Sequence, residues 1–253
     1  MAKAEREALR GRAQELGLYG LCARWAEFCG EAWISTLIEI EESERRRRSL
    51  QRRLDDAKIG TVRPLADFDW KHPRKLSRAR VEELFELRFL EGAGEGAGRN
   101  VIFVGPNGVG KTMLAKNLAH HAVARGYKVR FTEAAAMLAD LAAQDGPAAL
   151  HRRLQRYIKP DLLVLDEIGY LTYNDRSADL LFQVVNGRYQ RTSTIITTNL
   201  AFTEWGTVFP NATCVVTLID RLCHHAEIIP IEAESYRLKE SRERATKPKT
   251  SRR

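Results

Sequence analysis

Three short segments of the sequence carry side chains that can do chemistry, and each of them follows a run of apolar residues. The first is GPNGVGKT, residues 105–112, which lies between the apolar run VIFV and the helical pattern MLAKNLAHHAV. The spacing G-x-x-x-x-G-K-T is typical of a loop whose backbone N–H groups bind phosphate oxygens where a helix begins. The alternative is a glycine-rich turn without a ligand, but both flanking elements match what the phosphate-binding motif requires.

We expect this loop to bind the phosphates of a nucleotide. Lys111 would reach the β- and γ-phosphates, and Thr112 would bind Mg²⁺ through its hydroxyl. The residues expected to contact the nucleotide are Gly105, Pro106, Asn107, Gly108, Val109, Gly110, Lys111, Thr112 and Met113.

The second segment, DLLVLDEIGYL at residues 161–171, ends an aliphatic run with two acids, Asp166 and Glu167. Burying a carboxylate costs free energy unless a cation, a hydrogen bond or a reaction uses it. Beside a phosphate-binding loop, an Asp at the end of a strand holds Mg²⁺ and its water shell, and we assign that role to Asp166. Glu167 is then placed to polarise a water molecule for in-line attack on the γ-phosphate. Without a nucleotide nearby, the pair would be a strand-end ion pair or a helix cap.

The third segment is TSTIITTNL, residues 192–200, in which an apolar strand pattern ends at Thr198 and Asn199. A neutral amide at this point can hydrogen-bond the attacking water or the γ-phosphate without adding negative charge to an anionic centre. The alternative is an Asn that only begins a turn. The pair of Asp166 and Glu167 favours an ATPase over a small-molecule kinase.

The elements that must position these segments alternate along the chain. Strand patterns occupy residues 101–104, 128–132, 162–165, 193–198 and 227–231; helical patterns separate them, and a further helix is expected at 78–90. Strands separated by helices favour a mainly parallel sheet covered by helices on both faces, so the expected fold class is α/β.

Composition and charge restrict the class of protein. Of the 253 residues, 44% are hydrophobic and 29% are charged, which is typical of a soluble globular protein. No window is apolar enough to span a membrane and the N-terminus is charged, so we expect a cytoplasmic protein. The four cysteines form no C-x-x-C pair, and we interpret them as reduced thiols.

The net charge of +8 is concentrated at the two ends of the chain. Residues 1–80 hold 18 Lys and Arg against 13 Asp and Glu, and residues 237–253 hold 8 against 2, whereas residues 81–236 hold 15 against 18. This distribution favours a polyanionic partner bound by the ends of the chain; the alternative is that the charge only serves solubility.

The sequence of the first part of the chain predicts a small helical domain. Apolar residues such as Leu18, Leu21 and Trp25 recur at helical spacing, and the last helix runs into RRRRSLQRR, where six arginines fall in nine positions. Prolines oppose helix in the linker that follows, and its aromatic residues favour docking onto the next domain. We therefore expect a helical domain that binds DNA or a partner at 1–60, a docked linker at 61–77, the α/β domain at 78–240 and a disordered basic tail at 241–253.

The arginine cluster is the best candidate for contact with DNA phosphates. A basic cluster without a recognisable base-reading motif supplies affinity but little sequence specificity. The alternative is a solvated, charged helix face. The candidate residues are Arg45, Arg46, Arg47, Arg48, Arg52 and Arg53.

Longer stretches of the sequence resemble one family. LADFDW, DEIGYL, SADLLFQVVNGRYQRTSTIITTNLAFTEWGTVF and IDRLCHHAEIIPIEAESYRLKE are similar to the IstB-like family, and the resemblance covers about residues 62–240. Members of that family are AAA+ helper ATPases of insertion-sequence transposition, related to DnaC-type helicase loaders. The resemblance implies an AAA+ P-loop fold with a central parallel sheet and a small all-α N-terminal domain. It also implies ATP and Mg²⁺ as ligands, with double-stranded DNA, a cognate transposase and further copies of the chain as partners.

The resemblance further implies three residue roles. Asn199 matches the sensor 1 position, Arg221 in IDRL the arginine finger, and Arg237 in SYRLKE the sensor 2 position. Phosphoryl transfer gathers charge on the equatorial oxygens, and a guanidinium from a neighbouring subunit can neutralise it, so both arginines imply ATP sites at subunit interfaces. The alternatives for Arg221 are an ordinary ion pair with Asp220 or a DNA contact.

Two other functions remain open. A helicase loader of the DnaC kind would share every ATPase residue and differ in an N-terminal domain built to bind a helicase. A nucleotide-gated scaffold would bind ATP and DNA with negligible turnover, although the intact Glu167 argues against it.

Overall fold

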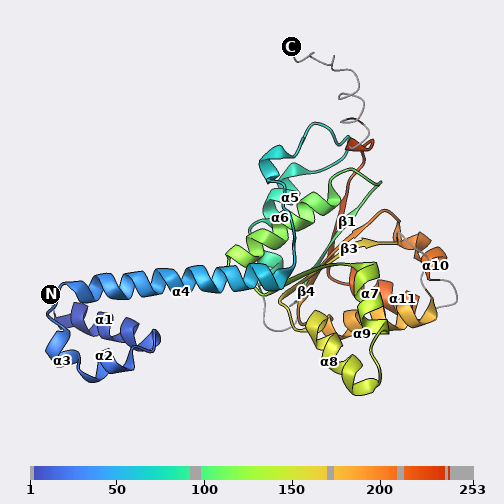
Figure 1. Ribbon diagram of the computed structural model, residues 1–253. Helices are drawn as coiled ribbons and strands as arrows, with labels where there is room; N and C mark the ends of the chain where they lie inside the picture. Colours follow the sequence, from blue (N-terminus) through green and yellow to red (C-terminus); the bar gives the residue numbers. More distant parts are fainter. Residues whose placement is uncertain (1–2, 92–97, 170–173, 210–213, 237–238, 240–253) are drawn as a thin grey trace, which may run out of the picture. The chain divides into compact units, whose positions relative to one another are not determined.

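The computed structural model describes residues 3–91, 98–169, 174–209, 214–236 and 239, and it divides the chain into two compact units (Figure 1). The first unit comprises Met1–Arg53 and the second Leu54–Arg253. The division falls inside one helix, and the linker segment expected at residues 61–77 belongs to the second unit.

The first unit is helical, as the sequence predicted. Apolar side chains at helical spacing form a small core of Leu9, Ala13 and Leu16 with Ile34 and Ile38. Its elements are α1 (Lys3–Glu15), α2 (Tyr19–Ala23), α3 (Trp25–Phe28) and α4 (Trp33–Ala57), the last of which continues into the second unit.

The second unit contains a five-stranded sheet in which every pair of neighbouring strands is parallel. Its order is β2-β3-β4-β1-β5, and the predicted strands are confirmed with small shifts at their ends. The strands are β1 (Asn100–Val104), β2 (Val129–Glu133), β3 (Leu162–Ile168), β4 (Ser193–Thr198) and β5 (Ala226–Pro230). All six residues of β4 are buried, as expected for a central strand covered on both faces.

Helices cover both faces of the sheet (Figure 1). One face carries α5 (Arg78–Leu84) and α6 (Lys111–Ala124), and the other carries the remaining long helices. These are α7 (Ala134–Ala142), α8 (Pro147–Ile158), α9 (Asp175–Arg188) and α11 (Val215–Cys223). Their apolar residues, such as Met137, Leu181 and Leu218, form one core with Leu163 and Ile196 of the sheet. The α/β fold class is therefore confirmed.

Short elements complete the fold: α10 (Trp205–Val208) and the 3₁₀ turns η1 (Leu65–Asp67), η2 (Arg88–Leu90) and η3 (Phe202–Glu204). The helix expected at 78–90 ends at Leu84. Leu87 has a φ of 60°, in the left-handed region, and this break allows both Leu87 and Phe89 to be buried. Within the described ranges, no helix combines the length and apolar character needed to cross a bilayer.

Candidate nucleotide-binding site

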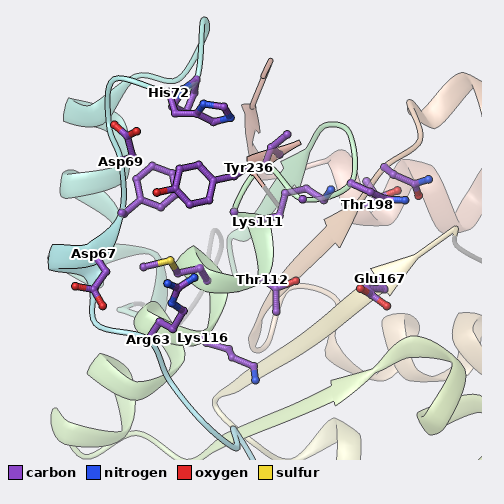
Figure 2. Close-up of a pocket in the computed structure, with 18 of the residues that line it drawn as sticks. Arg63, Asp67, Asp69, His72, Lys111, Thr112, Lys116, Glu167, Thr198 and Tyr236 are labelled. Atoms are coloured by element: carbon purple, nitrogen blue, oxygen red, sulfur yellow. The ribbon is translucent and has the colours of Figure 1, made fainter. Parts of the chain in front are cut away.

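The three segments with reactive side chains meet at one edge of the sheet. Strands β3, β4 and β1 are parallel neighbours, so the residues that follow their carboxyl ends lie side by side. A pocket of about 550 Å³ opens there, lined by the loop at 107–113, by Glu167, Thr198 and Asn199, and by part of the linker segment. In Figure 2, Lys111 and Thr112 lie between side chains of the linker segment and Glu167.

The loop between β1 and α6 depends on its glycines. Gly108 and Gly110 have φ values of 79° and 100°, a region that favours glycine. A Cβ atom on Gly110 would lie 2.6 Å from the Phe68 ring, and one on Gly105 would lie 2.2 Å from the carbonyl oxygen of Ile231. The loop therefore packs closely against its neighbours, and α6 begins directly after it, which suits an N-terminal phosphate site.

Lys111 is the first residue of α6 and is only 8% exposed. Its Nζ donates hydrogen bonds to the carbonyl oxygens of Gly105 at 2.6 Å and Pro106 at 2.7 Å. The ammonium group thus lies folded over the loop, where a bound triphosphate would offer it anionic acceptors in place of neutral carbonyl groups.

Asp166 is 4% exposed, and two threonine hydroxyls hold its carboxylate. Thr112 Oγ1 donates to Asp166 Oδ1 at 3.0 Å, and Thr197 Oγ1 donates to the same oxygen at 2.5 Å. Hydroxyl and carboxylate oxygens are hard ligands that suit Mg²⁺, which binds one or two protein groups together with substrate phosphates. Thr112 and Asp166 therefore fit a magnesium ion and could hold it beside the phosphates.

Glu167 has an unusual backbone conformation. Its φ of 61° is left-handed, and the pairing of β3 with β4 shifts register between Leu165 and Ile168. The Glu167 N–H donates to Thr197 Oγ1 at 2.9 Å, while its exposed side chain lines the pocket. One buried threonine thus fixes both members of the acid pair. The role of Thr197 was not predicted from the sequence, because β4 carries four Ser and Thr residues and nothing local distinguishes this one.

Asn199 lines the pocket where the sequence analysis expected it. The end of β4 is tied to the phosphate-binding loop, because the Gly105 N–H donates to the Thr198 carbonyl at 3.1 Å. Thr198 Oγ1 also accepts a bond from the Leu200 N–H at 3.1 Å, which fixes the turn that carries Asn199.

The linker segment forms a second wall of the pocket, a role that the sequence did not reveal. Phe68 packs against the loop, and on the same side the Tyr236 N–H donates to the Gly108 carbonyl at 3.0 Å. The expected docking of residues 61–77 agrees with this arrangement. The aromatic residues of the segment were the signal that it needed burial.

Two further contacts join the linker segment to the residues after β5. His72 Nε2 donates to the Glu234 carbonyl at 2.8 Å, and Lys239 Nζ forms an ion pair with Asp69 at 3.1 Å. The hydrogen bond from Lys239 holds the pKa of Asp69 below its ordinary value. This side of the pocket is therefore built by two segments far apart in the sequence.

Other residues that the sequence singled out do not line this pocket. Arg221 lies on α11 and contacts α9, and it forms no ion pair with Asp220 or any other acid that the structure describes. Arg237 lies outside the described residues.

The arginine cluster belongs to the first unit, and all of its members except the half-buried Arg53 are exposed. The side chains of arginines 45–48 are 46% to 76% exposed, and they share three acids, Glu41, Glu42 and Glu44, at N···O distances of 2.7 to 3.6 Å. Exposed ion pairs are weak, and four arginines exceed three acids, so the face remains cationic.

The parallel sheet, the glycine loop and the acid pair define a P-loop nucleotide-binding protein of the AAA+ class. The chain matches the model of the IstB-like ATP binding protein family over residues 6–244, and it belongs to that family. ATP is therefore the nucleotide that this chain binds.

Similar proteins come from insertion sequences. The chain is 33% identical to an ATP-binding protein of insertion sequence IS5376 from Geobacillus stearothermophilus, covering 96% of this chain and 99% of the relative. It is 38% identical to an ATP-binding protein of insertion sequence IS21 from Pseudomonas aeruginosa, covering 81% and 76%.

Solved structures share the fold. The DnaI structure has a TM-score of 0.56 at 18% identity, covering 68% of this chain and 92% of DnaI. AMPPCP-bound DnaA from Aquifex aeolicus has a TM-score of 0.51 at 18% identity, covering 74% and 58%.

Proposed function

We propose that this protein is an ATPase that assembles on double-stranded DNA and recruits or activates the transposase of its insertion sequence. One observation carries the proposal: a phosphate-binding loop, an exposed Glu and an Asn line one pocket, and a buried Asp accepts a hydrogen bond from the loop's threonine, in a chain whose relatives come from insertion sequences. Such a protein would act on DNA in the cytoplasm.

The proposed reaction is hydrolysis of the terminal phosphoanhydride bond of ATP. Glu167 orients a water molecule and accepts its proton as the water oxygen forms a bond to the γ-phosphorus. The bond from that phosphorus to the bridging oxygen breaks, and the electron pair leaves with ADP. Lys111 stabilises the phosphate charge, and Asn199 hydrogen-bonds the water or the γ-phosphate. A magnesium ion held by Thr112 and Asp166 would neutralise charge on the phosphate oxygens.

We propose that the site is completed by a second copy of the chain. Arg221 would supply a guanidinium to the ATP of its neighbour, since it does not line the pocket of its own subunit. Arg237 is proposed to contact the γ-phosphate. A cation stabilises the transition state of phosphoryl transfer most when it lies where negative charge develops on the phosphate oxygens. This favours an arginine supplied by a neighbouring subunit.

DNA contact is proposed for the arginine cluster, residues 45–48 with Arg52 and Arg53, because all of these side chains except Arg53 are exposed and arginines 45–48 outnumber the acids that pair with them. A second row of exposed cations, Arg152, Arg156 and Lys159, follows one face of α8 and is the next surface to test. Both surfaces offer charges without a base-reading motif, so binding should depend on phosphates more than on sequence.

Hydrolysis is tested by Glu167→Gln, which keeps the shape of the side chain and removes the base. We expect ATP binding to persist while steady-state turnover falls by about 100-fold or more. Lys111→Ala is the contrasting variant and should weaken binding itself, measured by titration with a fluorescent ATP analogue. Native turnover in Glu167→Gln would refute the catalytic role. Negligible turnover in the parent protein, with and without DNA, would favour a nucleotide-gated scaffold.

DNA binding is tested by changing arginines 45–48 to Ala together. Each neutralised phosphate releases counterions, so the slope of log affinity against log salt should flatten by about 0.9 for each phosphate that the variant no longer neutralises. Affinity should fall equally on unrelated duplexes, and ATP binding should remain. The matched variant changes Arg152, Arg156 and Lys159. If only that variant alters the slope, α8 carries the DNA and the arginine cluster is a solvated face.

The partner is tested by capture. We expect the protein, with ATP and duplex DNA, to retain the transposase encoded beside it in the insertion sequence and not a replicative helicase. Retention of the helicase alone would favour a helicase loader of the DnaC kind.

A further inference from the structure

Arg221 is held by neutral groups on α9, which packs directly against α11 (Figure 1). Its Nη1 donates a hydrogen bond to Asn186 Oδ1. Its guanidinium carbon lies 4.9 Å from the ring centre of Phe182 and 5.6 Å from that of Tyr189, within the range of cation–π attraction. Phe182 and Asn186 lie one turn apart on the same face of α9, and Tyr189 directly follows the helix. These three side chains together form a cradle for Arg221.

The chemistry of this cradle leaves the positive charge in place. An amide oxygen and two aromatic faces orient a guanidinium without cancelling its charge, whereas a carboxylate would neutralise it. No acid within the described ranges forms an ion pair with Arg221, although Asp220 is its neighbour in the chain. Asn186 is exposed and Arg221 is half-buried, so the held cation remains accessible from outside the subunit.

A hydrogen bond between Tyr189 and His224 also supports the cradle. The Tyr189 hydroxyl and His224 Nδ1 lie 2.9 Å apart in a hydrogen bond, which ties the residue after α9 to the residue after α11. The orientation of the Tyr189 ring over Arg221 is therefore fixed by both helices.

We propose that Asn186, Phe182 and Tyr189 are positioning residues that present Arg221, oriented but not neutralised, to the γ-phosphate of ATP bound by a neighbouring copy. This inference rests on the proposed function, because it requires that Arg221 act on the ATP of another subunit. It assigns a role to α9 residues that do not line the subunit's own nucleotide pocket.

The decisive variant is Asn186→Asp, which keeps the size and the hydrogen-bonding oxygen but adds a negative charge beside Arg221. If Asn186 only supported the fold, this change would preserve or strengthen the contact. We expect instead that kcat falls by about tenfold or more, while KM for ATP and binding of a fluorescent ATP analogue change less than about twofold. Asn174→Asp makes the same change at the N-terminal cap of α9, keeps the oxygen that accepts from the Ser177 N–H, and should keep the native kcat because the added charge lies at the other end of the helix.

Substitutions at two positions test orientation. Asn186→Ala removes one hydrogen bond to a charged group, whose loss corresponds to about a tenfold lower kcat. Tyr189→Phe keeps the ring and loses only the bond to His224, so its kcat should fall less than that of Tyr189→Leu, which loses the ring. Native kcat in both Asn186→Asp and Asn186→Ala would overturn the inference, and so would a higher kcat, since that would mean the cradle restrains Arg221.

Mixed assemblies separate the inference from the proposed function. Mixing Arg221→Ala with Glu167→Gln should restore part of the activity, because some interfaces then join an intact Glu167 to an intact Arg221. Asn186→Asp should likewise be rescued by Glu167→Gln. It should not be rescued by Arg221→Ala, because the defects of Asn186→Asp and Arg221→Ala lie on the same side of the interface. If the first mixture shows no rescue although both variants are present, the shared site is refuted, and the inference with it. Rescue in the first mixture together with a native kcat in Asn186→Asp refutes the inference alone.

Discussion

Thr197→Val should destabilise the second unit although it changes the size of the side chain very little. The Thr197 hydroxyl is fully buried and makes two bonds, one to the Asp166 carboxylate and one from the Glu167 N–H. Valine leaves no cavity, so the loss comes from hydrogen bonding. After the change, the Glu167 N–H has lost its acceptor and Asp166 keeps the bond from Thr112.

The size of the effect follows from these two bonds. A hydrogen bond to a charged group contributes about 1.5–3 kcal/mol, and a buried N–H left without a partner costs about 1–3 kcal/mol. Because valine transfers more favourably to the interior than threonine does, we expect a net loss of about 2–4 kcal/mol in the free energy of unfolding. A domain of 150–250 residues loses about 2–4 °C in Tm per kcal/mol, so the thermal midpoint should fall by roughly 5–15 °C.

The assay is urea denaturation of the whole protein beside a matched control. Thr132→Val makes the same change on β2, where the hydroxyl bonds only to the Glu133 carbonyl at 3.2 Å, and should cost under about 0.5 kcal/mol. A loss below about 1 kcal/mol for Thr197→Val would refute the reasoning. A double-mutant cycle with Asp166→Asn gives a second criterion, because the double variant should lose less than the sum of the two single losses if Thr197 acts through Asp166.

Three further predictions concern other parts of the second unit. Arg188→Met should cost about 3–5 kcal/mol in urea denaturation, because a guanidinium that is 2% exposed then leaves four backbone carbonyl groups without their donor. Gly110→Ala should weaken binding of a fluorescent ATP analogue by about tenfold or more, whereas Gly126→Ala, with a similar φ of 102° but nothing within 4 Å of the added atom, should leave it unchanged. Burial and the hydrogen bond to Asp140 raise the pKa of Tyr157 to about 12, so stability is fully present below pH 10 and falls as the pH rises toward 12; urea midpoints of Tyr157→Phe should lack this fall.

The strands and the reactive segments could be predicted because their signals are local. Short runs rich in apolar and β-branched residues mark strands, and a parallel sheet brings their carboxyl ends to one edge. Lys111, Glu167 and Asn199 each follow such a run closely, so the position of the strand also gives the position of the side chain. The glycine spacing of the loop is a further signal, because few structures other than a phosphate-binding loop require that spacing.

The supporting contacts could not be predicted, because they depend on register between distant segments. Thr197 contacts Asp166 because β3 and β4 are neighbouring strands. Neither segment carries a local signal that indicates which strand is its neighbour. The early end of the helix at Leu84 has the same origin, since burial of Leu87 and Phe89 outweighs a continuous helical pattern. The division into two compact units has no local signal either, because it falls within one helix whose periodicity is unbroken.

The arginine cluster shows a different limit. The sequence indicated more arginines than local pairing can neutralise, and the structure pairs four of them with three acids on the same helix. Such exposed pairs exchange readily with solvent and with other anions, because each contributes little free energy. Geometry therefore agrees both with a solvated face and with a phosphate-binding face, and the salt slope distinguishes them because it counts the phosphates that are neutralised.

The acid pair shows how one backbone angle divides two roles between adjacent residues. In a regular strand, consecutive side chains point to opposite faces, so an Asp and a Glu in sequence would not serve one pocket. The left-handed φ of Glu167 and the register shift beside it end that alternation. Asp166 can then remain buried on the hydroxyls of Thr112 and Thr197, where a cation would be held, while Glu167 stays exposed to the pocket, where water enters. Because Thr197 holds both the carboxylate of one acid and the backbone of the other, the strain at Glu167 and the burial of Asp166 are stabilised by the same side chain.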